Sequence, residues 1–358
     1  MDRILVINVG STSTKLAEFE EGKLCWSEGV SHDAESLSVF EKAYDQVEMR
    51  RSVITDILDR NHCRFERLTA VATRAPLYPK PVEAGAYAVN DSMVDDIMNR
   101  PAVFHPGNLA ILYVREIADK YGIPAIAFDS ASENERWEVT KVTGLPEIRR
   151  SGKTHTLNMR EVAMEYCEQN GIDYAQSTFV VAHMGGGTTL DLHYHGKVID
   201  GISDDFGPFS PTRMGAIPGY ELVRLVQQWK GTPEALLKKL QRESGLFAYF
   251  GTTDLREVEK LAKKDDNAKL VLDAMCLNIA KGIGSLSIVV DGKVDAIILT
   301  GGMAYSDFVT GKIREKVSFL APVVVVPGEN EMKAIANGAM RAIRNKAIHE
   351  YASVLSQS

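Results

Sequence analysis

The sequence predicts an α/β protein in which one structural unit occurs twice, and three observations predict it. Ile4–Ile7 is a continuous apolar run typical of a buried strand, and it leads into a turn of glycine and hydroxyl residues, Gly10–Thr14. Phe179–Met184 and Gly185–Thr189 repeat this pattern. Both copies continue through a second strand, a tight Gly-Lys turn and a third strand. One such turn alone is usually an ordinary hairpin, but the repetition predicts two related halves, each with a phosphate-sized turn that faces a shared cleft.

The composition limits the classes of protein to consider. A chain of 358 residues is long enough for two domains with separate cores. Its net charge of -7 provides no basic footprint, so nucleic acid is not an expected partner. Its four cysteines lack Cys-x-x-Cys spacing, which fits reduced thiols and offers no metal site. No apolar run approaches the roughly 20 residues that span a bilayer, and the N-terminus lacks a removable signal segment. We therefore expect a cytoplasmic protein without a membrane partner.

The first half continues with segments of helical periodicity. Apolar residues at helical spacing predict one or two helices over Ser36–Arg60. Asn90 can cap a helix over Asp91–Met98, and Gly122 can close another over Asn108–Tyr121. Such apolar stripes are typical of helices that pack on a core.

Two predicted strands in this half end at a charged residue. The strand Leu68–Thr73 ends at Arg74, before a proline-rich loop, and the strand Ile123–Phe128 ends at Asp129. An arginine in this position is usually a solvated surface group, and an aspartate often caps the next turn. Because α/β sheets bind ligands at the carboxyl ends of their strands, both residues are also candidates for groups that face the cleft.

A long helix that precedes the second hairpin is predicted to begin within Ser151–Asn158. This stretch looks like a P-loop, but the first glycine of that pattern is missing and no apolar strand leads into it, so we reject a P-loop. His155 lies near the helix start. It is either a surface histidine or a hydrogen-bond donor to an anion beside the positive end of the helix.

The second set of three strands ends near Ile202 and is followed by an irregular segment, Asp204–Gly219. This segment is rich in glycine and proline and carries Arg213. Loops of this kind in an otherwise regular chain are often functional. Two helices, Tyr220–Trp229 and Pro233–Ser244, are predicted to follow.

The segment Gly251–Glu257 opens the next helix. Asp254 and Glu257 have the spacing of a capping box, which explains both acids without a ligand. The capping box does not explain Arg256.

A long helix, Asp265–Val289, leads into the predicted strand Asp295–Thr300. Gly282 and Gly284 in the helix predict close approach to a neighbouring element. The strand ends at Gly301-Gly302, and two glycines between a strand and a helix let the backbone approach a nucleotide.

The last predicted strand, Val323–Val326, ends at Pro327–Glu331. A helix rich in small residues is predicted from there to the C-terminus. The acids of this segment either cap the helix or hold a cation.

The order of these pieces resembles the acetate and butyrate kinase (acetokinase) family of the sugar kinase, Hsp70 and actin superfamily. The resemblance covers nearly the whole chain, and the compact length is similar to that of butyrate and branched-chain fatty acid kinases. The chain departs from these kinases in the loop after Arg74, which is rich in proline rather than glycine. This difference concerns the acyl chain length of the substrate rather than the chemistry. Six fragments carry the resemblance: Asn8–Lys15, His183–Gly187, Gly207–Arg213, Gly251–Glu257, Ile298–Gly302 and Pro327–Met332.

The resemblance implies two duplicated ribonuclease-H-like α/β domains with a nucleotide cleft between them. The first would comprise residues 1–145 and a returning helix within 333–358, and the second, adenosine-binding domain would comprise residues 146–332. The resemblance also implies a homodimer or a higher homo-oligomer.

The resemblance further implies roles for individual residues. Arg74 and Arg213 would bind the carboxylate and the transferring phosphoryl group, with Asp129 beside them, and His155 would contact the phosphoryl group in the transition state. The residues implied to bind ATP or ADP, through its phosphates or its adenosine, are Asn8, Ser11, Thr12, Ser13, Thr14, His183, Gly185, Gly186, Gly187, Asp254, Arg256, Gly301 and Gly302.

The implied reaction is the reversible transfer of the γ-phosphoryl group of ATP to butyrate or another short-chain or branched carboxylate. Its products are an acyl phosphate and ADP. Mg²⁺ would be ordered by Asn8 and an acid, either Glu331 or Glu329. Because a carboxylate is already ionised at neutral pH, no general base is required, and stabilising the charge of the phosphoryl group is the main task.

Three other functions stay open. Acetate or propionate could be the acceptor. A sugar or polyol kinase of the same superfamily would need a base for its hydroxyl acceptor, and Asp129 is the candidate. An ATP-switched binding protein of the Hsp70 or actin type would have no small acceptor, and fold alone does not exclude it, although paired arginines argue against it.

Overall fold

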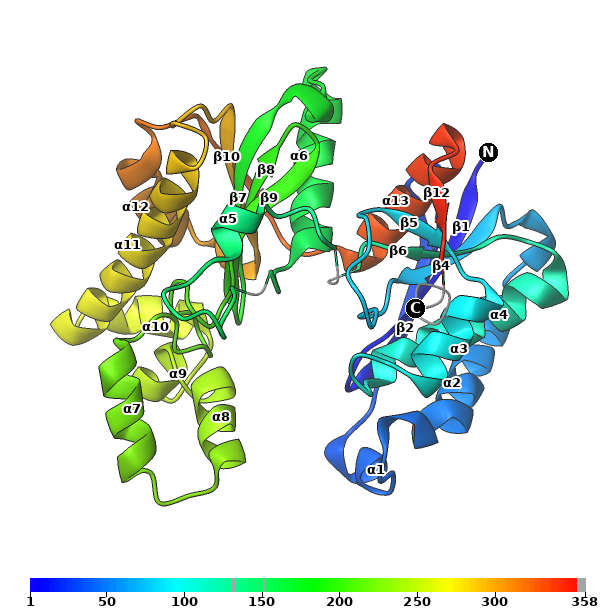
Figure 1. Ribbon diagram of the computed structural model, residues 1–358, viewed down its shortest axis with the longest axis horizontal. Helices are drawn as coiled ribbons and strands as arrows, with labels where there is room; N and C mark the ends of the chain where they lie inside the picture. The colour runs from blue at the N-terminus through cyan, green and yellow to red at the C-terminus, as the bar shows by residue number, and fades with distance from the viewer. Residues whose placement is uncertain (131–132, 151, 353–358) are drawn as a thin grey trace. The chain divides into compact units, whose positions relative to one another are not determined.

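The computed structural model describes residues 1–130, 133–150 and 152–352, and the chain divides into two compact units (Figure 1). Unit 1 comprises Met1–Asn134 and Asn330–Ser358, and unit 2 comprises Glu135–Glu329. Each unit has its own sheet and its own hydrophobic core. The mixed α/β fold predicted from the repeated pattern is therefore confirmed.

Unit 1 is built on one sheet of seven strands. In spatial order the strands are β12 (Ile348–Glu350), β5 (Ala86–Ala88), β6 (Ala125–Phe128), β4 (Ala70–Arg74), β1 (Arg3–Val9), β2 (Ser13–Glu20) and β3 (Lys23–Ser31). β1 pairs antiparallel with β2 and parallel with β4, which pairs parallel with β6. The carboxyl ends of β1, β4 and β6 therefore meet at one edge of the sheet, where ligands bind in α/β folds.

Helices cover this sheet. In order, the helical elements of unit 1 are α1 (Ala34–Ser38), η1 (Ala43–Gln46), α2 (Val47–Arg60), η2 (Phe65–Arg67), α3 (Asp91–Asn99), η3 (Pro106–Leu109), α4 (Ala110–Tyr121) and α13 (Glu331–Asn345). Figure 1 shows α13 on one side of the strands and α2, α3 and α4 on the other. A Cβ at Gly338 would lie 2.1 Å from the Phe128 ring, so only glycine lets α13 come this close to β6. The predicted caps are confirmed: Asn90 Oδ1 accepts the Met93 N–H at 2.9 Å, and Gly122 ends α4 with a φ of 67°.

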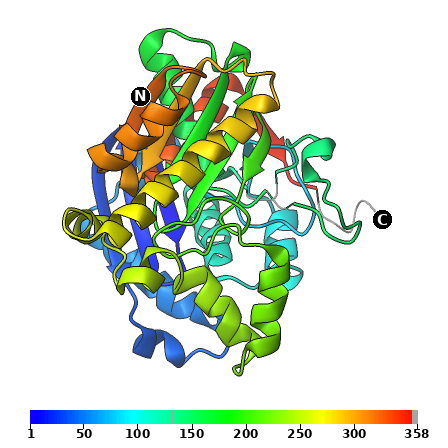
Figure 2. The same ribbon diagram turned by 90° about the vertical axis from the view of Figure 1, so that its left-hand side faces the viewer.

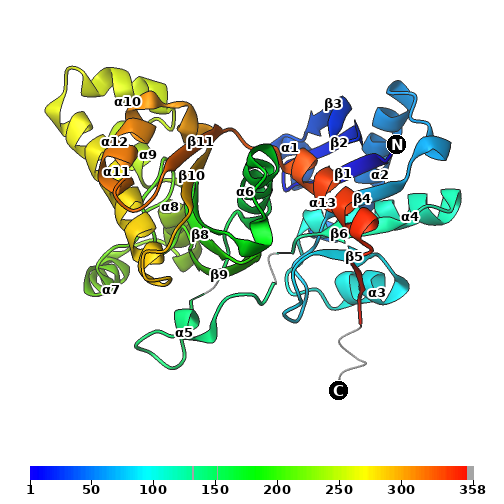
Figure 3. The same ribbon diagram turned by 90° about the horizontal axis from the view of Figure 1, so that it is seen from above.

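Unit 2 is built on a second sheet, which has five strands. In spatial order they are β11 (Val323–Pro327), β10 (Ala296–Gly301), β7 (Thr178–Met184), β8 (Thr188–Tyr194) and β9 (Lys197–Ile202). Val180 and Ala182 face a core formed with α11 (Asp266–Ile288) and α12 (Asp307–Val317), whereas Phe179 and Val181 face α6 (Thr156–Asn170). The two helix layers lie on opposite faces of this sheet (Figure 3), and α11 runs across its face in Figure 2.

Shorter helices complete unit 2. They are α5 (Glu138–Lys141), η4 (Tyr174–Gln176), α7 (Gly219–Gln228), α8 (Pro233–Arg242), α9 (Leu246–Phe250), α10 (Leu255–Ala262) and η5 (Gly302–Tyr305). The predicted capping box is half formed. Asp254 caps α10 by accepting the Arg256 N–H at 2.9 Å, but Glu257 accepts a bond from the Thr252 hydroxyl at 2.6 Å rather than reaching back to the Asp254 backbone.

The two hairpins repeat each other in detail. Both residues of each tight turn, Glu21-Gly22 in unit 1 and His195-Gly196 in unit 2, have positive φ, which matches the twist of the strands that they join. The pairing of the second and third strands is irregular at the same place in each unit, between Glu18 and Phe19 and between Leu192 and His193. A shared bulge at equivalent positions supports an ancient duplication.

The chain crosses between the units earlier than the predicted domain boundaries at 145/146 and 332/333. The Glu135 carboxylate accepts the Val198 N–H at 3.0 Å, and the Trp137 N–H donates to the Ile199 carbonyl at 2.9 Å, so residues 135–145 belong with β9 in unit 2. At the second crossing, Glu331 begins α13 and belongs to unit 1.

The starts and ends of two predicted helices can be compared with the structure. The prediction of a helix up to the C-terminus is wrong, because α13 ends at Asn345, Lys346 is left-handed with a φ of 52°, and β12 returns to pair with β5. The helix predicted to begin within Ser151–Asn158 begins at Thr156. Ser151 itself lies outside the described residues, as do Ala131 and Ser132 after the Asp129 strand end.

Within the described ranges, one helix, α11, is long and apolar enough to cross a bilayer, with a mean hydropathy of 1.3 in its most apolar window. The expectation of no such segment is corrected to that extent. Half of the window is buried, and Leu272, Met275, Ile279 and Ile283 of α11 pack in the core of unit 2, as in a core helix. The predicted close approach holds for Gly282, where a Cβ would lie 3.2 Å from Leu190, but a Cβ at Gly284 would meet nothing within 4 Å.

Candidate active site

The first candidate phosphate turn, Gly10–Thr14, joins β1 to β2 in unit 1. The Gly10 N–H closes it by donating to the Ser13 carbonyl at 2.8 Å. Ser11 and Thr12 are exposed and Ser13 is half-buried, so their side chains can meet a ligand.

Thr14, the last residue of this turn, is fully buried. Its hydroxyl accepts a hydrogen bond from Arg50 Nη1 at 2.9 Å, which directs the hydroxyl proton to His32 Nε2 at 3.0 Å. Burial lowers the pKa of His32, which keeps the ring neutral and able to accept this proton. The buried hydroxyl of Thr14 therefore links the turn to Arg50 and His32 in the interior of unit 1.

Three predicted residues from distant parts of unit 1 meet at the carboxyl edge of its sheet. Asn8 Nδ2 donates to Glu331 Oε2 at 2.8 Å, and Arg74 Nη1 donates to Glu331 Oε1 at 2.8 Å. Asn8 comes from β1, Arg74 from the end of β4, and Glu331 from the first turn of α13. The Arg74 side chain is 45% exposed, so much of its guanidinium remains available to an anionic ligand.

Asp129 follows β6 at the same edge of this sheet and is 3% exposed. Its φ of 57° is left-handed, and its N–H donates to the Gly85 carbonyl at 3.1 Å. A left-handed backbone is uncommon for a non-glycine residue, but aspartate tolerates it better than most.

The second candidate phosphate turn, Gly185–Gly187, lies in unit 2 and anchors the irregular segment after β9. The Gly186 carbonyl accepts three hydrogen bonds: from the Ser210 hydroxyl at 2.7 Å, from the Thr212 hydroxyl at 2.8 Å and from the Thr212 N–H at 3.0 Å. These bonds fasten the segment to the turn.

The same segment carries Arg213. Its Nε donates to Asp204 Oδ2 at 2.7 Å, and its Nη1 donates to the Thr212 hydroxyl at 2.8 Å. A Cβ at Gly187 would lie 3.7 Å from Arg213 Cγ, so the arginine packs directly on the glycine turn. These contacts hold the Arg213 guanidinium beside the second candidate phosphate turn.

Two predicted histidines lie side by side in unit 2. The rings of His155 and His183 stack with centroids 4.2 Å apart. His155 Nδ1 lies 2.9 Å from the Thr189 hydroxyl, and His183 Nδ1 lies 3.1 Å from Asn158 Nδ2. Because the Asn158 amide nitrogen can only donate, His183 Nδ1 accepts, and the Nε2 of a neutral His183 carries the proton. Burial lowers the pKa of His183 to about 4, so it is a neutral donor at pH 7.

The two acids that the sequence left as alternatives belong to different units. Glu331 joins Asn8 and Arg74 in unit 1. Glu329 belongs to unit 2, where its Oε2 lies 4.0 Å from His183 Nε2. Within unit 2, Glu329 therefore lies next to His183.

A buried carboxylate supports the segment that carries His155. Asp191 is 0% exposed and accepts hydrogen bonds from the hydroxyls of Thr154 and Thr156, both at 3.0 Å, and from Arg136 Nη2 at 3.0 Å. Burial raises the pKa of Asp191, and Arg136 opposes this shift. The residues on both sides of His155 are thus tied to one carboxylate on β8.

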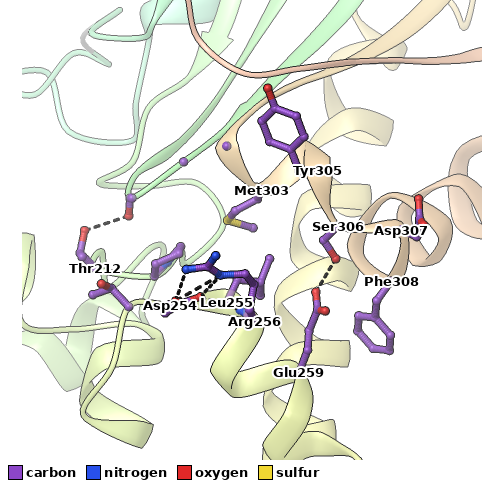
Figure 4. Close-up of a pocket in the computed structure, with 15 residues that line it drawn as sticks. Thr212, Asp254, Leu255, Arg256, Glu259, Met303, Tyr305, Ser306, Asp307 and Phe308 are labelled. Carbon is purple, nitrogen blue, oxygen red and sulfur yellow. Dashed lines mark hydrogen bonds and ion pairs between the residues drawn. The ribbon is translucent and has the colours of Figure 1, made fainter.

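Unit 2 also contains a cavity of about 850 Å³ beside the glycine turn (Figure 4). This volume lies in the range of small-molecule sites, about 300–1,000 Å³. Of the predicted nucleotide-binding residues, Gly185, Gly186, Asp254, Arg256 and Gly302 line it, whereas His183, Gly187 and Gly301 do not. The residues that sequence reasoning missed are Pro211, Thr212, Thr253, Leu255, Glu259, Met303, Tyr305, Ser306, Asp307 and Phe308.

Several of the missed lining residues lie in or next to segments that the sequence had already marked as candidate sites. Thr212 lies in the irregular segment, and Met303–Phe308 directly follow the Gly301-Gly302 turn. Gly301 is required there, because its φ is 87° and a Cβ would lie 2.5 Å from the Met184 carbonyl. Leu255, Met303 and Phe308 add apolar surface that can cover a purine base, and the glycine turn adds backbone N–H groups for phosphates.

Arg256, which capping alone left unexplained, folds back on Asp254 at the cavity (Figure 4). Its Nε and Nη2 bond the carboxylate at 2.9 and 2.6 Å, and this lowers the pKa of Asp254 to about 2. The Arg256 side chain is 84% exposed. The pair presents a carboxylate and an exposed guanidinium to a ligand.

The residues present fit a magnesium-nucleotide complex better than a dedicated metal cage. Within residues 1–130, 133–150 and 152–352, no group of three or more His, Cys, Asp or Glu side chains could hold a metal ion. Mg²⁺ usually keeps several waters and binds through one or two carboxylates and the phosphates of the substrate. Glu331 with Asn8 fits that mode.

The chain is similar in sequence and fold to known carboxylate kinases. The Acetokinase family profile matches residues 136–343. The chain is 39% identical over 344 residues to butyrate kinase 2 of Clostridium acetobutylicum, covering 95% of this chain and 96% of that protein. It is 38% identical over 348 residues to a probable butyrate kinase 2 of Caldanaerobacter subterraneus subsp. tengcongensis, covering 97% and 98%. The solved acetate kinase of Porphyromonas gingivalis has the same fold, with a TM-score of 0.76, 19% identity and coverage of 96% of this chain and 100% of that one.

The chain therefore belongs to the acetokinase family. It is a phosphotransferase with a carboxyl group as acceptor. Kinases of this family use ATP or ADP with a divalent metal ion. The resemblance and the reaction class predicted from the sequence are confirmed.

Proposed function

We propose that the chain catalyses the reversible, magnesium-dependent transfer of the γ-phosphoryl group of ATP to butyrate or another short or branched fatty acid. The products are an acyl phosphate and ADP. The observation that carries the proposal is the likeness to two proteins named as butyrate kinases, 38–39% identical over at least 95% of this chain.

Unit 2 holds the nucleotide in this proposal. Adenosine occupies the cavity of about 850 Å³ beside Asp254, Arg256 and the Gly301-Gly302 turn. The phosphates lie on the Gly185–Gly187 turn, where the neutral His183 donates a hydrogen bond from Nε2. A neutral donor binds phosphate without needing a change of protonation near pH 7.

Three cationic or donor groups act on the transferring phosphoryl group and the acid. Arg74 and Arg213 neutralise the carboxylate and the equatorial oxygens, and His155 donates to the phosphoryl group in the transition state. Asp129 orients these partners rather than abstracting a proton, since the acceptor acid is already ionised at pH 7. Asn8, Ser11, Thr12 and Ser13 contact the phosphoryl group from unit 1, and Thr14 supports them from inside.

Asn8 and Glu331 hold Mg²⁺ when it is bound with the nucleotide. The ion supplies positive charge that offsets the phosphate oxygens. Arg74 Nη1 also bonds Glu331 at 2.8 Å, which keeps this arginine beside the proposed metal ligand.

Hydroxamate trapping tests the reaction. With ATP, Mg²⁺, butyrate and hydroxylamine, we expect a hydroxamate signal that depends on the acid, because an acyl phosphate reacts with hydroxylamine and a sugar phosphate does not. ADP formation without hydroxamate, with or without a sugar, would contradict carboxylate transfer and favour the sugar kinase or the ATP-switched binding protein.

The preferred acid is tested by steady-state rates with acetate, propionate, butyrate, isobutyrate and longer acids. We expect kcat/KM to be highest for a four- or five-carbon acid. A maximum at acetate or propionate would favour the alternative acceptor.

We also propose that the protein works in the cytoplasm as a homodimer or a higher homo-oligomer. Sedimentation that shows only monomer, or fractionation that finds the protein in membranes, would contradict these two points.

A further inference from the structure

The largest fully buried side chain in the described part of the chain is a cation. Arg50, on α2, is 0% exposed and contacts the Gly10–Thr14 turn. A buried arginine is ordinarily paired with an acid. Among the described residues, Arg50 has no such partner, because each of its hydrogen bonds ends on a neutral oxygen.

The hydrogen-bonding capacity of this guanidinium is nevertheless filled. Gln46 Oε1 accepts from Nε at 3.2 Å and from Nη2 at 2.9 Å. The Ser13 carbonyl and the Thr14 hydroxyl accept from Nη1 at 2.7 and 2.9 Å, and the Ser11 carbonyl accepts from Nη2 at 3.1 Å. These bonds match the five N–H groups of a guanidinium, so the positive charge remains uncompensated although every N–H has an acceptor.

The bonds from Arg50 orient the turn. In a trans peptide the N–H points away from the carbonyl, so a Ser11 carbonyl that faces Arg50 turns the Thr12 N–H to the opposite side. Thr12 is exposed, and no group within the described ranges accepts its N–H. A cation bound to the carbonyl also polarises the peptide and strengthens that N–H as a donor. An anion on the exposed side of the turn therefore meets oriented donors with a buried charge behind them.

The neighbouring side chains add donors to this turn rather than negative charge. His105 Nδ1 accepts the Gly107 N–H at 3.0 Å, so its Nε2 proton is directed to the Ser11 hydroxyl at 2.9 Å, and the Ser11 proton is available to a ligand. Burial lowers the pKa of His105, and Arg74 and Arg50 lower it further. Glu331, the acid at the adjacent strand end, is already bonded to Arg74.

We propose that Arg50 is a positioning residue for phosphoryl binding, whose buried and uncompensated charge makes the Gly10–Thr14 turn an anion site. A bound phosphoryl group, such as that of an acyl phosphate or inorganic phosphate, compensates the positive charge of Arg50. The proposal rests on the proposed function for the identity of the phosphoryl group, but phosphate binding alone tests it.

The substitution Gln46→Glu gives the sharpest test. It keeps an oxygen acceptor for Arg50 Nε and Nη2 and adds one negative charge beside the guanidinium. Gln169→Glu, at an exposed position near the end of α6, makes the same change in net charge far along the chain. The full chain is titrated with inorganic phosphate, at constant ionic strength and without nucleotide, and Kd is obtained from the rise in Tm with ligand concentration.

We expect Gln46→Glu to raise the Kd for phosphate about tenfold and to raise the Tm without ligand by about 2 °C or more, because the buried cation gains a counter-ion. Gln169→Glu should change neither value by as much. The Kd for ADP should stay within about twofold in both variants, since the residues proposed to hold adenosine and the two phosphates of ADP lie in unit 2. A phosphate Kd in Gln46→Glu equal to that in Gln169→Glu would overturn the proposal.

A second pair of variants applies where Gln46→Glu fails to fold. Arg50→Lys and Arg50→Gln both lose the fork of hydrogen bonds, but only the lysine keeps the charge. We expect the lysine variant to bind phosphate at least about tenfold more tightly, whereas equal affinities would mean that Arg50 only braces the turn. A failed hydroxamate test would remove the carboxylate kinase proposal and leave these binding results unaffected.

Discussion

The ring of His155 lies almost parallel to the ring of His183, with centroids 4.2 Å apart and an angle of 15° between the planes. Thr189 holds the first ring through Nδ1, and Asn158 holds the second. Two charged imidazolium rings would repel each other at this distance, and burial lowers the pKa of His183 to about 4. The stack therefore contains a His183 that is neutral at pH 7, which leads to the first prediction.

Stability should fall between pH 6.5 and pH 4 in part because of His183. The unfolded chain binds a proton near pH 6.5, whereas the folded chain keeps His183 neutral down to about pH 4. Its contribution is therefore complete above pH 6.5 and is lost as the pH falls, by up to about 3 kcal/mol at pH 4. In urea denaturation, His183→Asn should lose less stability than the wild type across this window. Parallel pH profiles for the two proteins would contradict a depressed pKa.

Thr156→Val should weaken the support of His155 without removing it. The variant loses one hydrogen bond to the Asp191 carboxylate, worth about 1.5–3 kcal/mol of stability. We expect kcat to fall about tenfold with little change in the KM for ATP if His155 acts on the transition state as proposed. Thr156→Ser keeps the hydroxyl and should recover most of kcat. If valine and serine reduce kcat equally, the hydroxyl bond to Asp191 does not position His155.

Arg74→Ala and Arg213→Ala should each abolish turnover and leave the fold intact. By analogy with arginine fingers, the loss of one such cation costs about 10³-fold or more in kcat. The ion pairs that are lost are partly exposed, so the effect on the free energy of unfolding should stay below about 1 kcal/mol. Arg60→Ala is the matched control, since Arg60 pairs with Glu28 on the surface of unit 1. Near-normal activity in either alanine variant would refute the assigned role.

Comparing Glu331→Gln with Glu329→Gln should show which of these two acids holds Mg²⁺. Glu331 contacts Asn8 and Arg74, whereas Glu329 lies near His183. In titrations of activity with Mg²⁺, we expect the half-saturating concentration to rise about tenfold or more in Glu331→Gln and to change much less in Glu329→Gln. The reverse order would assign the metal to Glu329.

The duplication and the family could be predicted because their signals are local. A strand, a turn of glycine and hydroxyl residues and a Gly-Lys turn follow one another within each half, and the structure repeats even the bulge between Glu18 and Phe19 at Leu192 and His193. Arg74 and Glu331 could be singled out because strand ends and helix starts are recognisable. The family resemblance added Asn8, and the structure brings the three residues together.

The supporting residues could not be predicted, because their partners are distant in sequence. Arg50 bonds the turn residues that lie 36 to 39 positions before it, and the helical pattern of α2 does not mark it as a buried residue. Asp191 bonds threonines 35 and 37 positions away. The end of α13 was also missed, since nothing in the local sequence marks Lys346 as left-handed or β12 as a partner of β5.

The order of the units along the chain has a consequence for biosynthesis. Unit 1 needs α13, which buries Ala334, Ile335 and Ala339 in that unit, but α13 leaves the ribosome after all of unit 2. Domains generally fold as they emerge during synthesis, so the middle of the chain can acquire its native structure while the first sheet still lacks one of its covering helices. A nascent chain stalled before Asn330 would present that uncovered apolar face to chaperones and proteases, and α13, which is translated only after unit 2, covers it.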